Sequence, residues 1–90
     1  MSQAIVDPEE LRRFATSLKH FNAELQMNIA GLHSQLMALG DSWRDQEHEQ
    51  FRQEFEETIK AMEHFMESAG LYVPFLLRKA ERIEEYLSQK

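Results

Sequence analysis

The stretch Leu39-Gly40-Asp41-Ser42-Trp43-Arg44-Asp45 separates two long segments of helical periodicity, and it decides the fold. Gly40 can adopt the left-handed conformation that ends a helix at low steric cost. The short polar residues that follow are of the types that favour the N-cap of a second helix, with Asp45 a good candidate. We therefore expect the chain to reverse direction at residues 40–45 and to form a helical hairpin.

Trp43 is the only tryptophan of the chain, and it lies in the predicted turn between two helix ends. Its ring has a large apolar surface to bury, and its indole N–H needs a hydrogen-bond acceptor. Two roles remain open at this point. Trp43 is either a plug that covers the open end of the core, or a partly exposed element of a recognition surface.

The segment before the turn carries a helix start signal and a long apolar repeat. Asp7 can cap the helix, Pro8 suits its first position, and Glu10 can complete a capping box. Leucines then recur every seven residues, at Leu11, Leu18, Leu25, Leu32 and Leu39. This pattern predicts one helix over about residues 8–39.

The segment after the turn predicts a second helix, over about residues 45–88, with three apolar columns at heptad spacing. Gly70 and Pro74 interrupt it, and the helix should either kink or break near residues 70–74, because proline clashes with the carbonyl four residues back. We expect a kink in one continuous helix, since the three columns stay in phase across the interruption. Three columns are more than one partner helix can cover, so we predict an all-α hairpin that dimerises into an antiparallel four-helix bundle. The predicted core and dimer-interface residues are Leu18, Leu25, Leu32, Phe55, Met62, Phe65, Met66 and Val73.

Composition limits the classes of function. Ninety residues make a single domain, and the formal net charge of −6 argues against binding to nucleic acid. There is no cysteine, hence no disulfide or thiolate metal site. Residues 1–8 lack the basic region and apolar core of a general secretory signal, and no apolar run has the length of a membrane span. Eight acidic residues lie between Asp45 and Glu67, which we interpret as a solvated face.

The sequence offers little for catalysis. Asp45-x-x-His48 copies the spacing of one ligand pair of a carboxylate-bridged di-metal site, but the inward carboxylates that such a site also needs are missing from the apolar columns. His20, His33 and His64 stand singly, as surface histidines usually do. We expect no catalytic residues, no metal and no cofactor. A metal-binding four-helix protein is kept as a third hypothesis.

In the residues around Trp43, the chain resembles the WXG superfamily. These are small helical hairpins that type VII secretion exports from Gram-positive bacteria and mycobacteria. In that family a Trp-x-Gly tripeptide forms the turn, an apolar residue stands four positions before the Trp, and a Phe stands eight after it. Leu39, Trp43 and Phe51 match, whereas Asp45 stands in place of the Gly. Asp45 is physically reasonable there because it can cap the second helix. The candidate turn motif is Leu39, Gly40, Trp43, Asp45 and Phe51.

The resemblance implies a binding protein of a bacterium, either a secreted cargo without a cleavable signal or a partner for cargo, with a second copy, a sister hairpin or a secretion ATPase as binding partner. The family's export signal is a Tyr followed four residues later by an acid. Here Tyr86 is followed by Lys90 and Tyr72 by Leu76, so the usual signal is absent. The alternative function is an intracellular helical scaffold or adaptor that stays in the cytoplasm.

Overall fold

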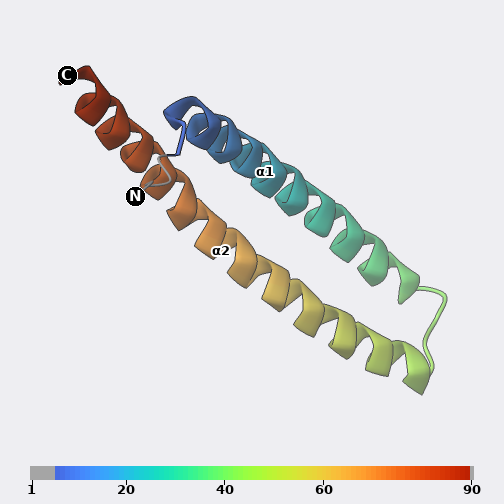
Figure 1. The fold of residues 1–90 in the computed structure, drawn as a ribbon. Helices are drawn as coiled ribbons and strands as arrows, with labels where there is room; N and C mark the ends of the chain where they lie inside the picture. The colour runs from blue at the N-terminus through green and yellow to red at the C-terminus, as the bar shows by residue number, and fades with distance from the viewer. Residues whose placement is uncertain (1–5, 90) are drawn as a thin grey trace.

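A computed structural model describes residues 6–89 of the chain as two antiparallel helices joined by a short turn (Figure 1). Helix α1 spans Pro8–Leu39 and helix α2 spans Gln46–Ser88. All regular secondary structure in these residues is helical. The all-α hairpin expected from the sequence is therefore confirmed. The expectation about a secretory signal concerns residues 1–5 in part, and these lie outside the described residues, as does Lys90.

The hairpin is a thin rod and not a globule. Its extents are 68 × 24 × 15 Å and its radius of gyration is 20.2 Å, whereas a compact domain of this length would have a radius of gyration of roughly 12 Å. Helix α2 has 43 residues against 32 in α1, and its C-terminal end projects beyond the start of α1 in Figure 1. Two helices alone thus leave most of their side chains at the surface.

The buried core is a narrow seam between α1 and α2. Its buried apolar side chains are Ala15, Ile29, Leu36, Ile59, Ala69 and Ala80. The alanines let the helix backbones approach closely, and no large side chain among the described residues is fully buried. Such a seam buries far less apolar surface than a globular core, so little hydrophobic free energy holds the isolated hairpin together.

Each helix begins with an aspartate cap. The Asp7 carboxylate accepts a hydrogen bond from the backbone N–H of Glu9 at 3.0 Å, one residue earlier than the capping box expected with Glu10 requires. Pro8 occupies the first turn, where its missing N–H costs nothing.

Pro74 does not break the second helix into two pieces. Helix α2 continues through Pro74 as one helix.

Polar side-chain contacts join distant parts of the hairpin. Near its open end, the Arg12 guanidinium binds the Glu84 carboxylate in a two-pronged ion pair, with one N–O distance of 2.6 Å. Near the middle, the Asn22 side-chain amide donates to the backbone carbonyl of Met66 at 3.0 Å. These contacts link α1 to the middle and to the C-terminal end of α2, which the short turn cannot position by itself.

Candidate functional site: the turn and an exposed aromatic face

Helix α1 ends through tight right-handed turns. The backbone N–H groups of Gly40 and Asp41 donate to the carbonyls three residues back, and that of Trp43 donates to Leu39 at 2.8 Å. Gly40 has φ −62° and ψ −17°, a right-handed conformation. The expected left-handed conformation of Gly40 was therefore wrong. The last carbonyls of α1 are satisfied by these donors, so a left-handed reversal is not needed.

The structure indicates a different role for Gly40, which is close approach. A Cβ atom added there would lie 3.2 Å from the Met37 carbonyl oxygen and 3.6 Å from the imidazole of His48. The distance to the Met37 oxygen is tight, whereas the distance to the His48 ring is an ordinary van der Waals contact. Glycine at residue 40 thus avoids a crowded contact with the carbonyl of Met37 in the last turn of α1.

Asp45, which replaces the glycine of the Trp-x-Gly tripeptide, is the N-cap of α2. Its extended backbone precedes the helix, and its carboxylate accepts a hydrogen bond from the backbone N–H of His48 at 3.0 Å. That bond satisfies one of the free N–H groups at the helix start, and the negative charge suits the positive end of the helix dipole. Although Asp45 departs from the family tripeptide, it supplies a start signal for the second helix.

Trp43 begins a row of rings along the first turns of α2. Its indole lies 4.9 Å from the His48 imidazole and 6.1 Å from the Phe51 ring, measured between ring centroids. Phe51 in turn stacks on Phe55 at 5.8 Å, with planes 10° apart. Trp43 is half-buried and Phe51 is 46% exposed. The turn motif is thus partly a plug and partly an open surface.

His48 was not expected in this role, because a single histidine on a helix gives no sequence signal that separates a buried from an exposed ring. It is 8% exposed, and its Nε2 atom has no hydrogen-bond partner among the described residues. The carboxylate of Asp45 binds the backbone of His48 and caps the helix. Within residues 6–89, no three His, Asp or Glu side chains are arranged as a metal site.

Beyond the turn, large apolar side chains form one long exposed face, here called the aromatic face. It combines Phe14, Phe21, Leu32 and Leu39 of α1 with Phe51, Phe65 and Tyr72 of α2, and each of these side chains is 42–58% exposed. Within each helix their spacings of seven, eleven or fourteen residues are close to whole numbers of helical turns, which places them on one side. A contact between the Phe21 and Phe65 rings, 6.1 Å apart and edge to face, joins the two helices on this face.

The predicted core and interface residues divide between the seam and the aromatic face. Leu32 and Phe65 are exposed on the aromatic face. The other six are half-buried where the two helices meet: Leu18, Leu25, Phe55, Met62, Met66 and Val73. Their burial in a dimer stays a prediction.

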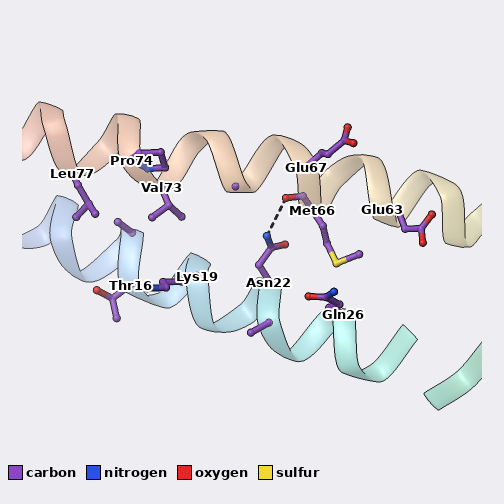
Figure 2. A pocket seen from close by; sticks show the side chains of 13 residues that line it. Thr16, Lys19, Asn22, Gln26, Glu63, Met66, Glu67, Val73, Pro74 and Leu77 are labelled. Carbon is purple, nitrogen blue, oxygen red and sulfur yellow. Dashed lines mark hydrogen bonds between the residues drawn. The ribbon is translucent and has the colours of Figure 1, made fainter. Parts of the chain in front are cut away.

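A different side of the hairpin carries a groove between the helices, of about 640 Å³ (Figure 2). Met66, Val73 and Leu77 line it together with small residues, and Lys19 and Glu63 are among its polar side chains. None of the side chains of the aromatic face lines this groove or the next one along the helices. In the figure Asn22 reaches across the groove to the Met66 carbonyl.

Over the described residues, neither helix combines the length and the apolar character required to cross a bilayer.

No curated protein and no solved structure matches the chain. A family model does match, over residues 3–69, and its description is "Proteins of 100 residues with WXG". That range covers the whole of α1, the Trp43 turn and the first half of α2. With most of its length matched, and with Trp43 at the bend of a two-helix hairpin, the chain belongs to the WXG100 family of small helical proteins.

Proposed function

We propose that this chain is a non-enzymatic protein–protein interaction module whose aromatic face binds a second helical hairpin. The observation that carries the proposal is the exposure of this face, because Phe14, Phe21 and Phe65 are all more than 40% exposed in the isolated hairpin. Monomeric soluble proteins rarely leave such a long apolar surface in contact with water. A second copy or a sister hairpin would cover it and convert the thin seam into the core of a four-helix bundle.

Charge supports an antiparallel arrangement of two copies. Between Asp41 and Glu67 there are nine acidic and three basic residues, whereas the rest of the chain has seven of each. The net charge of −6 is therefore concentrated at the turn end of the hairpin. A parallel pair would bring two acidic ends together, and an antiparallel pair places each acidic end beside a neutral one.

Membership of the WXG100 family supports a role as a cargo of type VII secretion, or as a partner of such cargo, in a bacterium. A secretion ATPase is then a further candidate partner. One observation favours the alternative of an intracellular scaffold or adaptor, which is that Lys90 stands where the family's signal has an acid after Tyr86. Under the main proposal, the paired hairpin supplies the export signal.

Analytical ultracentrifugation tests the pairing. We expect the wild-type protein to sediment as a dimer at micromolar concentration. Phe65→Glu, which places a charge in the aromatic face, should give a folded monomer. Met27→Glu is the matched control, because Met27 is 72% exposed and outside the aromatic face. A wild-type monomer at this concentration, or equal behaviour of the two variants, would refute the proposal.

Export is tested separately, in a bacterium with an active type VII system. The chain is expressed alone, then with a sister hairpin that carries a Tyr-x-x-x-acid signal, and the culture medium is examined for both proteins. Export only with the sister hairpin would support the role of a partner that depends on another signal. Retention in both cases, with dimerisation intact, would favour the intracellular scaffold.

A further inference from the structure

One side of α2, here called the outer stripe, carries a regular row of exposed side chains. Lys60, Glu67 and Pro74 at its edge also line the grooves between α2 and α1. From Lys60 to Glu85 its positions recur at alternating steps of four and three residues, which keeps them on one side of a helix. Every position of the stripe is exposed, whereas Ile59, Ala69 and Ala80 are buried on the opposite side against α1. The stripe is therefore separate from the seam.

The centre of this stripe is apolar. Leu71 is 73% exposed, Pro74 is exposed beside it, and the adjacent Phe75 is 51% exposed. Over residues 69–77, α2 has no charged residue on any side, although it is rich in charge before and after. A helical segment that is apolar all round is usually covered all round, and neither α1 nor a partner on the aromatic face would cover Leu71.

The flanks of the apolar centre carry opposite charges. Glu67 precedes it and Arg78 follows it, while Lys60 and Glu85 stand further out on the two sides. Arg78 has no ion pair or hydrogen bond within residues 6–89, and the nearest basic group to Glu67 is the His64 ring at 4.0 Å. Figure 2 shows the Glu67 carboxylate directed away from α1. These charges are free to bind another molecule.

The arrangement is complementary to itself. When two copies of α2 lie antiparallel about a two-fold axis between Tyr72 and Val73, residues whose numbers add to 145 come opposite each other. Leu71 of one copy then faces Pro74 of the other. Glu67 faces Arg78, and Lys60 faces Glu85, each pair occurring twice because the interface is symmetric.

We propose that the outer stripe of α2 is a second self-association surface, which binds another copy of this chain in antiparallel orientation. It lies on a different side of the hairpin from the aromatic face, and it does not depend on the proposed function. Its apolar centre is small and its remaining contacts are exposed ion pairs, so the association is weak and sensitive to salt. Together with the aromatic face, it lets dimers join into larger assemblies.

Sedimentation velocity over a concentration series tests the proposal, with about 0.1 M and roughly 1 M salt as the two conditions. In the lower salt, we expect the mass to double from its starting value as concentration rises, and the higher salt should suppress the doubling. Glu67→Arg sets two arginines against each other and should weaken this step about tenfold. The double variant E67R/R78E restores opposite charges and should recover the wild-type affinity.

Glu24→Arg is the matched control, because it makes the same change of charge at an exposed position on α1 and should leave the doubling unchanged. Circular dichroism verifies that each variant is helical. No concentration-dependent doubling, equal effects of Glu67→Arg and Glu24→Arg, or failure of the double variant to recover would each overturn the proposal. The Phe65→Glu background separates the two surfaces: there the doubling should begin from a monomer.

Discussion

The indole of Trp43 lies against the imidazole of His48, with ring centroids 4.9 Å apart and ring planes tilted by 57°. This contact joins the turn to the first turn of α2, where the Asp45 carboxylate accepts a hydrogen bond from the backbone N–H of His48. It explains why a tryptophan in a turn of six residues is half-buried although no third helix covers it. The stability of the turn should therefore depend on both rings.

Replacement of Trp43 measures the plug directly. Because the ring is half-buried, Trp43→Ala should lower the free energy of unfolding by about 2 kcal/mol, which is less than the loss expected for a fully buried tryptophan. Trp43→Phe should restore most of that loss. Urea denaturation at neutral pH gives both values. In the folded wild type, tryptophan emission should be partly shifted to the blue and partly quenched by iodide, whereas emission like that of free tryptophan would contradict the packing.

The role of His48 separates ring packing from hydrogen bonding. Its Nε2 atom is buried without a partner among the described residues, so an apolar ring would lose no hydrogen bond there. We expect the free energy of unfolding of His48→Phe to lie within about 0.5 kcal/mol of the wild-type value. For His48→Ala we expect it to fall by about 1–2 kcal/mol. Equal losses in the two variants would show that the imidazole nitrogens, and not the ring, stabilise the turn.

The two helices and the bend were predictable because they depend on local signals. The heptad leucines, the caps at Asp7 and Asp45 and the polar turn all act within a few residues of one another. The burial of His48 was not predictable, because it depends on how closely α1 approaches α2 at Gly40. That approach is a property of the assembled hairpin.

The sequence also did not show which apolar columns of α2 would pack against α1 and which would stay exposed. Three columns on α2 are alike in composition, and nothing local indicates which of them α1 will cover. In the structure Met66 and Val73 lie along the groove between the helices, while Phe65 remains on the aromatic face. The small residues Ala15 of α1 and Gly70 of α2 both line this groove, which is again a tertiary relation.

Asp45 can be tested as a cap against the other cap in the chain. Asp45→Ala should cost about 1 kcal/mol of unfolding free energy, Asp45→Asn almost nothing, and Asp45→Gly, which restores the family tripeptide, a few tenths. Asp7→Ala is the matched comparison, since Asp7 caps α1 through an equivalent hydrogen bond of 3.0 Å. A loss from Asp45→Asn as large as that from Asp45→Ala would mean that the charge of Asp45, and not its hydrogen bond, matters most.

The ion pair between Arg12 and Glu84 gives a prediction about acid stability. The side-chain hydrogen bonds from Arg12 lower the pKa of Glu84 below its ordinary value. A carboxyl group whose pKa is lower in the folded state stabilises the fold at pH values above its unfolded pKa, about 4.3 for glutamate. That contribution is lost as the pH falls through the lowered pKa of the folded state.

We therefore expect Glu84→Gln to reduce stability at about pH 7, and the difference from the wild type to shrink towards zero at about pH 2, measured by urea denaturation at each pH. Glu49→Gln is the matched comparison, because hydrogen bonds from Arg52 lower the pKa of Glu49 in the same way. That pair lies within one turn of α2, so it can form without the hairpin and should contribute less to the pH dependence of folding. Since Arg12 and Glu84 are 72 residues apart in the chain, their pair forms only when the hairpin closes. A wild-type advantage over Glu84→Gln that stayed the same at both pH values would show that this ion pair does not hold the open end together.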